Sequence, residues 1–459
     1  MHRSFIKNKT KSFSGLSIGV VVLVLNLFPV FAKAQEVKSL SLQESINLSL
    51  KNSHILKASL AKSAQAAAAV TEAEENRLPN ASVSGSYLYM ANPNLAIKTK
   101  ALGGGGANDT SGNQKQIPHI NQAMYGIFNV SLPIYTGGKI RYGIESAKYL
   151  QQAALLDVEN DREAMILNTI NAYINLYKAS VTVDVVNENL LQSKHRDSVF
   201  SRLEQTGLLA RNDLLKAELQ TSNIELSLLD AQSNLKIANI NMDLMIGYPE
   251  TAILKTDSSG FDKTFSIKTI DDYEQLALQN RKDIMALSFR RKAATTAISL
   301  AKADKYPEIA LTGGYIAADI PHLITITNAA NIGVGLKYNL SSLWKTKSKV
   351  AQAKSREEEI MANEAQLSDE VKLSVNRDFE NLLLSQRKTD VYKKAVIQAE
   401  ENNRITQNKY NNALVNTTEL LDANVLLLQS KINLAVAKAD VLLAYSKLME
   451  TAGILSSNQ

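Results

Sequence analysis

Two very long segments without helix breakers, joined by one short turn, constrain the fold of this chain more than any other feature. Residues 139–205 contain no proline and a single glycine, Gly143, and residues 208–246 contain neither residue type. At ~1.5 Å of rise per residue, such helices extend over roughly 100 Å and roughly 58 Å. No compact domain needs a helix that long, and the charged residues within it exclude a membrane span. The sequence therefore predicts an antiparallel helical hairpin that projects far from the rest of the molecule.

The N-terminus has the composition of a secretory signal peptide. Four basic residues precede the apolar run 16–28, and Ala32-Lys33-Ala34 forms a cleavage site of the A-x-A type, so residues 1–34 are expected to be removed. An N-terminal membrane helix is the alternative for this run. The full chain has a formal net charge of +6, and the signal contributes five Lys/Arg and no Asp/Glu, so the mature chain has a net charge of +1. This balance offers no basic patch for nucleic acid.

Residues with catalytic or metal-binding chemistry are sparse. The chain has no cysteine, and its five histidines are scattered, which predicts no disulfide, no cysteine-based zinc site and no histidine pair at ligand spacing. The four-glycine run 103–106 follows no strand-to-helix pattern, so a surface loop is expected there and not a phosphate site. We expect no enzyme activity, no cofactor and no metal.

The second half of the chain repeats the first. An offset of 228 residues aligns the first helix of each half, and an offset of 206 residues holds after residue 125; the aligned pairs include Ala66/Ala294, Pro79/Pro307, Lys139/Lys345 and Gly247/Gly453. After the signal, the predicted units are a first repeat (35–247), a linker (248–269), a second repeat (270–453) and a tail (454–459). Each repeat is expected to contain a helix (41–77, 270–305), two strands and a long hairpin (139–246, 345–453).

Four segments of about ten residues alternate between apolar and polar positions, which predicts strands at 81–90, 126–135, 308–317 and 332–340. Their apolar sides are Val83, Tyr87, Phe128, Val130, Leu132, Leu311, Tyr315, Val334, Leu336 and Tyr338. Ten residues suffice for a tilted strand to cross a bilayer, so these residues are predicted to face lipid. A sheet packed on the helices of a soluble domain is the alternative. Because four strands cannot close a barrel, closure requires several chains, and three would supply twelve strands.

The returning helices carry apolar doublets in place of a single stripe. Leu214/Leu215 recur as Leu228/Leu229, and Leu420/Leu421 begin a similar series in the second half. Doublets spaced by two heptads predict two adjacent packing seams, as required of a helix with a neighbour on each side in a ring. A two-stranded coiled coil is the alternative, and it accounts for one seam only.

The segment 410–423, YNNALVNTTELLDA, resembles the tyrosine, hairpin-turn and Leu-Leu-Asp-Ala pattern of the TolC-type outer membrane efflux channels. With the signal peptide, the duplication and the strand pairs, the resemblance covers essentially all of the mature chain. It implies a mainly α-helical fold with a small β part. Three chains would join their long hairpins into an α-barrel across the periplasm and their strands into a 12-stranded barrel in outer membrane lipid. The linker 248–269 and the terminal segments would form an equatorial belt around the α-barrel. It also implies partners, namely a periplasmic adaptor and an inner-membrane pump of the resistance-nodulation-division or ABC type.

The same resemblance implies that an adaptor docks at the two hairpin tips. The corresponding residues are Thr206, Gly207, Leu208, Arg211 and Asp213 in the first tip and Ala413, Leu414, Val415, Thr417 and Glu419 in the second. Ala413 replaces the glycine of the first turn, so the tight turn is expected at Asn411-Asn412. Ordinary helix capping is the alternative role for these residues.

The family also narrows its periplasmic entrance with acidic residues, and the resemblance assigns this role to Glu400 and Glu401. Arg404 stands one turn farther on, where the family often has another acid. A solvated helix face is the competing interpretation of this segment.

The predicted function is a passive exit duct of a tripartite efflux or type I secretion system. A periplasmic adaptor protein is the alternative, although it would need one hairpin and a strand-rich domain. A coiled-coil adhesin stalk fits less well, because it does not account for two separate strand pairs. The sequence does not identify the exported substrate or the type of pump.

Overall fold

The computed structural model describes residues 37–91, 121–257, 265–321 and 324–455. The predicted signal peptide, the glycine-run loop and the end of the tail lie outside these residues. The elements, in chain order, are β1 (Val37–Leu40), α2 (Leu42–Asn52), α3 (His54–Glu75), β2 (Asn80–Tyr89), β3 (Gln122–Tyr135), α4 (Lys139–Gln205), α5 (Arg211–Ile246), β4 (Ile253–Thr256), α6 (Ile270–Asn280), α7 (Lys282–Ala303), β5 (Glu308–Ile320), β6 (Ile324–Lys337), α8 (Ser342–Asn411) and α9 (Thr417–Thr451).

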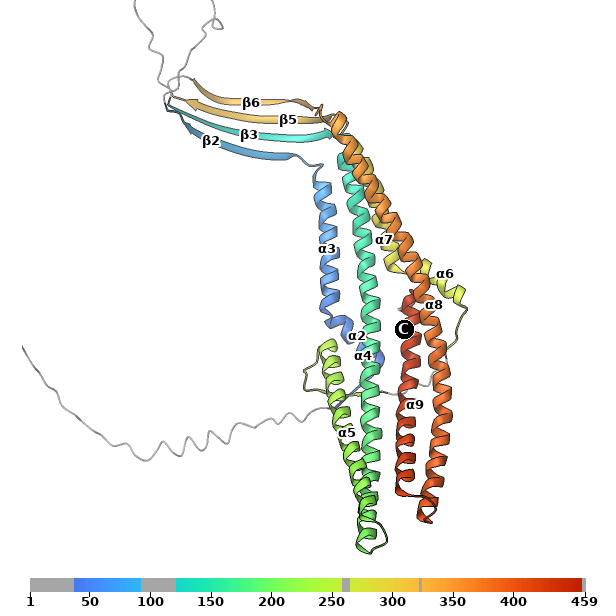
Figure 1. Cartoon of the computed structure of the whole chain (residues 1–459). Coiled ribbons are helices and arrows are strands. Elements are labelled where there is room, and N and C mark those ends of the chain that lie inside the picture. The colour runs from blue at the N-terminus through green and yellow to red at the C-terminus, as the bar shows by residue number, and fades with distance from the viewer. Residues whose placement is uncertain (1–36, 92–120, 258–264, 322–323, 456–459) are drawn as a thin grey trace, which may run out of the picture.

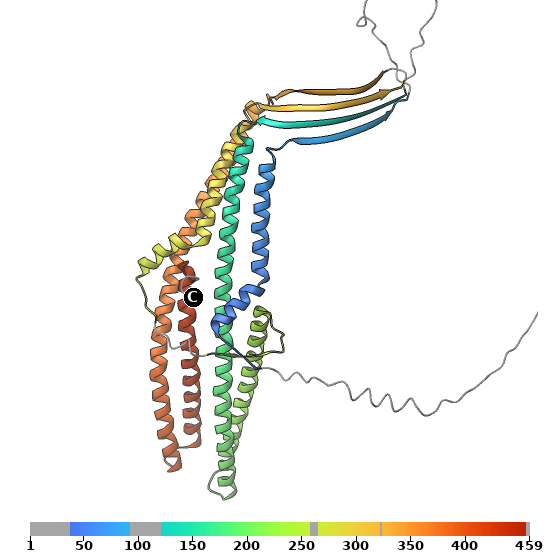
Figure 2. The ribbon, with the colours of Figure 1, turned by 180° about the vertical axis from the view of Figure 1, so that it is seen from behind.

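Long helices lie side by side in one elongated row, and the larger sheet bends away from one end of it (Figure 1). Near the sheet α4 packs against α3 and α7, and farther along it packs against α5 and α9. α8 packs first against α7 and then against α9. Consequently α8 forms one edge of the row along its whole length, and α3 followed by α5 forms the other edge, as the opposite view also shows (Figure 2).

The larger sheet is antiparallel, with the order β2-β3-β5-β6, so that β2 and β6 are its edges. Register pairs Val83 with Phe128, Phe128 with Tyr315, and Leu311 with Val334. Because directly opposed residues of antiparallel strands point to the same side, nine of the ten apolar residues predicted to face lipid lie on one face of this sheet, while Tyr338 follows the end of β6 at Lys337.

Three strands differ from their predicted bounds: β3 begins at Gln122 and not at residue 126, and the last two strands differ as well. β5 continues to Ile320 and β6 begins at Ile324, so residues 318–320 and 324–331 are strand and not loop. The β-branched stretch Ile324–Thr327 favours extended backbone, and a register shift after Ile316 lets the ladder continue. β6 also ends before residue 340, because Asn339 accepts hydrogen bonds from the backbone N–H and hydroxyl of Ser341 and starts the turn into α8.

Each predicted first helix is in fact two helices. The breaks fall at Ser53 and Arg281, and they leave helices of 11 and 22 residues in both halves of the chain. Ser53 has a non-helical ψ of 119°, and its side chain accepts a hydrogen bond from the Leu56 N–H at 3.1 Å. A glycine at the end of each returning helix fits against a break: a Cβ on Gly247 would lie 2.7 Å from the Asn52 side chain, and one on Gly453 would lie 2.8 Å from the Arg281 nitrogen.

A belt around these breaks contains the largest hydrophobic core. Its buried members include Ile46, Ile170, Met242, Leu382 and Leu448, which come from five different helices. A short parallel pair, β1 with β4, closes the belt and was not predicted. Buried Tyr173 ties this pair to α4, since its hydroxyl donates to the Leu40 carbonyl at 2.9 Å and accepts from the Asp257 N–H at 2.8 Å. The hairpins thus project from a rigidly packed belt.

Among the described residues, α9 alone has the length and apolar composition of a membrane-crossing helix. It packs along α8 and α4 in the row of helices.

Candidate functional site

The first hairpin tip, residues 206–210, is a tight turn of the Schellman type. The Leu208 N–H donates to the Leu203 carbonyl at 2.8 Å, and the Gly207 N–H donates to the Glu204 carbonyl at 2.9 Å. Gly207 has φ +74°, a left-handed conformation that costs glycine little. The turn leaves Leu208 77% exposed, with no pocket of its own to fill.

The second tip has the same geometry at an alanine. The Leu414 N–H donates to the Lys409 carbonyl, and the Ala413 N–H donates to the Tyr410 carbonyl, both at 2.9 Å. Ala413 itself takes φ +57°, so the prediction that Asn411-Asn412 makes the turn was wrong. Asn411 is still helical and Asn412 has φ −100°. A non-glycine residue in this conformation costs about 1–2 kcal/mol, which the two turn hydrogen bonds offset.

The tip residues differ in how far they are available to a partner. Thr206, Gly207, Leu208, Arg211, Ala413, Leu414 and Glu419 are exposed, and Asp213 and Val415 are partly exposed. Thr417 is only 3% exposed because it lies against Tyr410, with 3.5 Å between the two hydroxyl oxygens. The prediction that Thr417 takes part in docking therefore does not fit its position. Asn416 caps α9 by accepting from the Glu419 N–H at 3.0 Å, while Asp213 pairs with Lys216 at 3.3 Å.

A small apolar cluster joins the two tips. Phe200 of α4 stacks on Tyr410 of α8, with ring centroids 5.5 Å apart, and packs with Leu214, Ala217 and Leu420. The role of Phe200 could not be predicted from the sequence, because an isolated aromatic residue in a long helix carries no signal of its tertiary partner. The two hairpins therefore end in one shared contact.

The residues predicted to narrow the entrance, Glu400, Glu401 and Arg404, lie in α8 ahead of the second tip. Glu401 and Arg404 are paired across one helical turn, by hydrogen bonds of 2.8 Å and 2.7 Å from the guanidinium to both carboxylate oxygens. This pairing lowers the pKa of Glu401 and raises that of Arg404. Glu400 is exposed and makes no ion pair with any residue that the structure describes. In the single chain, then, the Glu401 charge is locally balanced.

Both edges of the helix row carry exposed apolar side chains at heptad-like spacing. On α5 they include Leu219, Leu226, Ile237 and Leu244, and on α8 they include Leu384, Val391, Ile397 and Ile405. The inner seams of the same helices are filled within the chain by clusters such as Val186, Leu190 and Ile224. Each edge therefore presents an apolar seam without a partner in the single chain.

No group of acidic or histidine side chains that could hold a metal ion occurs within the described part of the chain. The features that remain for function are the two tips, the apolar sheet face and the open edges.

These features place the chain in a class of elongated proteins that join two long helical hairpins to a four-stranded sheet. The chain belongs to the outer membrane efflux protein family, whose family model matches residues 45–248 and 274–453. The family consists of outer-membrane channels and is not an enzyme class, and membership supports an outer-membrane location.

Among curated proteins, the chain is 25% identical over 325 residues to the outer membrane protein TolC of Salmonella enteritidis. It is 24% identical over 330 residues to TolC of Escherichia coli (strain K12). Each match covers 66% of this chain and 64% of the relative, so less than two thirds of either TolC is matched.

Solved structures share the fold at lower identity. The outer-membrane channel OprN superposes with a TM-score of 0.74 at 17% identity, covering 90% of this chain and 89% of OprN. VceC from Vibrio cholerae superposes with a TM-score of 0.73 at 19% identity, covering 90% of this chain and 96% of VceC.

Proposed function

We propose that this protein is one third of a trimeric exit duct that spans the periplasm and the outer membrane. The observation that carries the proposal is the continuity of the open edges. One side of the molecule consists of β2, α3 and α5, and the other consists of β6 and α8. A head-to-tail contact between copies would pair β6 with β2, and α8 with α3 and α5, in a single interface. Repeated three times, this contact closes a barrel of twelve strands and a ring of helices.

The internal repeat supports this closure at the level of single residues. Inside the chain, Asp157 of α4 forms an ion pair with Arg290 of α7, at the junction between the two halves. In the internal repeat, the offset of 206 aligns Asp157 with Asn363 of α8, and the offset of 228 aligns Arg290 with Lys62 of α3. Asn363 and Lys62 are exposed and lie on opposite edges of the row of helices. Three chains with two repeats each would form a ring of six similar units, in which the contact between neighbouring chains has the same geometry as the contact between the two halves of one chain. Asn363 would then face Lys62 of the next subunit.

Cross-linking tests the closure directly, because the native chain has no cysteine. A Lys62→Cys/Asn363→Cys variant treated in membranes with a short bis-maleimide should run as a covalent trimer on denaturing gels. An Asp157→Cys/Arg290→Cys variant is the matched control, and it should link within one chain and remain monomeric. A linked control with no covalent trimer from the first pair, or a ladder that continues beyond three, would refute the ring.

The tips are the proposed docking surface for a periplasmic adaptor. Leu208 and Leu414 occupy equivalent turn positions, and both are more than 70% exposed. Exposed leucines at the end of two adjacent hairpins suit an apolar groove on a helical partner. Because the Phe200–Tyr410 stack joins the hairpins just above, adaptor contacts at the tips would act on both hairpins together.

The charge at the entrance gives a prediction about ion passage. Arg404→Ala should free the Glu401 carboxylate in each of three subunits, and the carboxylate stays ionised at pH 7 because its ordinary pKa is about 4.3. We expect divalent-cation block of the reconstituted channel to tighten roughly fivefold, since one charge pair of this kind is worth about 1 kcal/mol in water-exposed settings.

Arg356→Ala is the matched control for this measurement, since Arg356 pairs with Glu359 at 2.6 Å with the same three-residue spacing but much nearer the sheet. If single-channel recordings show equal block for native protein and Arg404→Ala, Glu401 does not line the entrance.

A further inference from the structure

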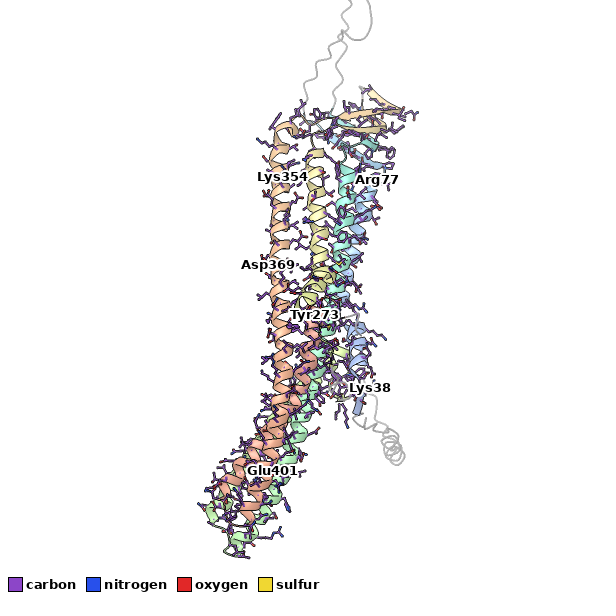
Figure 3. All side chains as sticks on the ribbon, turned by 90° about the vertical axis from the view of Figure 1, so that its right-hand side faces the viewer. Lys38, Arg77, Tyr273, Lys354, Asp369 and Glu401 are labelled. Carbon is purple, nitrogen blue, oxygen red and sulfur yellow. The ribbon has the colours of Figure 1, made fainter. Side chains whose placement is uncertain are left out.

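Positive charge is concentrated where the helices meet the sheet. We define this collar as residues 73–79, 137–148, 300–307 and 338–354. It contains ten Lys/Arg and four Asp/Glu, a surplus of six positive charges in a chain whose mature net charge is +1. The following stretch of α8, residues 357–370, has six acids and no Lys/Arg. Arg77 and Lys354 lie at the sheet end and Asp369 lies farther along α8 (Figure 3).

Internal pairing does not account for this surplus. Few acidic side chains of the collar are left to pair with the remaining lysines, since Asp304 already forms ion pairs with Lys139 at 3.0 Å and with Lys349 at 2.6 Å. Lys302, Lys347 and Lys354 are exposed and form no ion pair with any residue in the described ranges. The collar therefore has cationic side chains to spare.

The position of the lysines is also unfavourable for the helices that carry them. Neither α4 nor α8 has an acidic residue in its first turn, and residues 342–354 at the start of α8 contain four lysines and no acid. Cations in the first turn of a helix oppose the helix dipole, and Lys139 of α4 and Lys345 of α8 occupy such positions. An external anion would remove this cost.

Aromatic and apolar residues mark the same level. Trp344, the single tryptophan, is 64% exposed, and Leu340, Leu343, Tyr306 and Tyr338 beside it are exposed as well. Tryptophan and tyrosine are enriched where a membrane protein crosses from hydrocarbon to water. The collar thus combines interfacial aromatic residues with unpaired lysines.

Helical spacing indicates which way this surface points. Trp344, Lys347 and Lys354 recur at intervals of three and seven residues and so share one face of α8. Asn376 lies 29 residues beyond Lys347, which is close to eight whole turns, so Asn376 is on the same face of α8 as Lys347. The side-chain amide of Asn376 donates a hydrogen bond to the Glu274 carboxylate of α6 at 2.6 Å. Because α6 projects from the row of helices (Figures 1 and 2), this face of α8 points outward.

We propose that the collar binds the anionic phospholipid headgroups of the membrane leaflet from which the helices emerge, with Trp344 at the boundary and Lys347 and Lys354 as headgroup contacts. The proposal rests on the proposed placement of the sheet in the outer membrane. Anionic headgroups attract basic residues at a membrane surface, and this attraction falls within about a Debye length. Along α8, Lys347 lies about 8 Å and Lys354 about 18 Å from the first residue, Ser342, so Lys347 satisfies that limit at physiological salt and Lys354 satisfies it at low salt, where the Debye length is about 30 Å.

Trp344 makes the test direct, because it is the only tryptophan in the chain. The trimer is reconstituted in nanodiscs of phosphatidylcholine with phosphatidylglycerol, and quenching of Trp344 is compared between brominated forms of the two lipids. The native protein should prefer phosphatidylglycerol about fivefold at low salt, and Lys347→Gln/Lys354→Gln should abolish the preference. Lys388→Gln/Lys394→Gln, on the same helix far from the sheet, is the matched control and should retain it.

Two results would overturn the proposal: an unchanged lipid preference in Lys347→Gln/Lys354→Gln, or a Trp344 that no brominated lipid quenches. The Lys62/Asn363 cross-link separates this failure from a failure of the duct. A covalent trimer that shows no lipid preference would refute only the proposed role of the collar. Loss of both the trimer and the preference would refute the proposed duct as well.

Discussion

Replacing Val334 with arginine is expected to prevent stable trimers from accumulating in the outer membrane. Val334 lies on the apolar face of β6, opposite Leu311, and is 74% exposed in the single chain. If this face meets lipid, an arginine near the bilayer midplane costs about 2–4 kcal/mol per chain, and three copies cost roughly 6–12 kcal/mol per trimer. A penalty of that size exceeds what a barrel of marginal stability can absorb.

Gly333 provides the matched control, because it precedes Val334 and points to the opposite face. A Cβ there meets no atom within 4 Å, so the backbone at Gly333 has room for a side chain to start, and Gly333→Arg introduces the same residue on the other face. We expect heat-modifiable trimers in outer-membrane fractions from Gly333→Arg at near-native levels and at most a few per cent of that from Val334→Arg. Equal levels for the two variants would mean that the apolar face does not contact lipid.

The faces of the strands could be predicted from the sequence because the side-chain period of a strand is fixed at two. Val83, Phe128 and Tyr315 come from three strands, and each could be assigned to one side without knowledge of the pairing. The register then places them in one row. Strand ends were harder to predict, since Ile324–Thr327 are strand only because β5 is present to pair with them.

The long hairpins were predictable for a related reason. With no proline and a single glycine, Gly143, among its 67 residues, α4 has no point at which to stop. The breaks at Ser53 and Arg281 were missed because neither residue is a strong helix breaker. Gly247 and Gly453 occupy these breaks, a tertiary contact that local sequence does not encode.

At the tips, the sequence indicated the place but not every role. Leu208 and Leu414 are exposed at the turns, as a docking role requires. Thr417 is buried against Tyr410, and Ala413 takes the left-handed conformation itself. Both depend on how α8 and α9 cross, which composition alone does not determine.

Asp243→Asn is expected to stabilise the belt at neutral pH and to weaken its pH dependence. Asp243 is fully buried near the end of α5, where the helix dipole disfavours negative charge. One carboxylate oxygen accepts from the Asn239 amide at 2.7 Å, and the other has no hydrogen-bond partner among the residues described. Burial raises the pKa of Asp243 to about 6.

The sign of the effect follows from this direction. The folded chain holds the Asp243 proton more tightly than the unfolded chain, whose aspartate pKa is about 3.9. The contribution of Asp243 to stability is therefore most favourable below pH ~4, falls as the pH rises toward 6, and stays lowered above it. Asparagine resembles the neutral acid in size and cannot ionise. At pH 7 we expect Asp243→Asn to gain about 1–3 kcal/mol, and near pH 4 to equal the native protein.

Thermal unfolding followed by circular dichroism between pH 4 and pH 8 measures this difference, with apparent midpoints compared at one heating rate. Asp230→Asn removes an exposed carboxylate from the same helix and should leave the pH profile of the native protein unchanged. A gain of about 2–4 °C at pH 7 that disappears by pH 4 is the expected result for Asp243→Asn. A midpoint at pH 7 equal to or below that of the native protein would show that Asp243 carries no buried charge, since only an ionised group in this position has a penalty to lose.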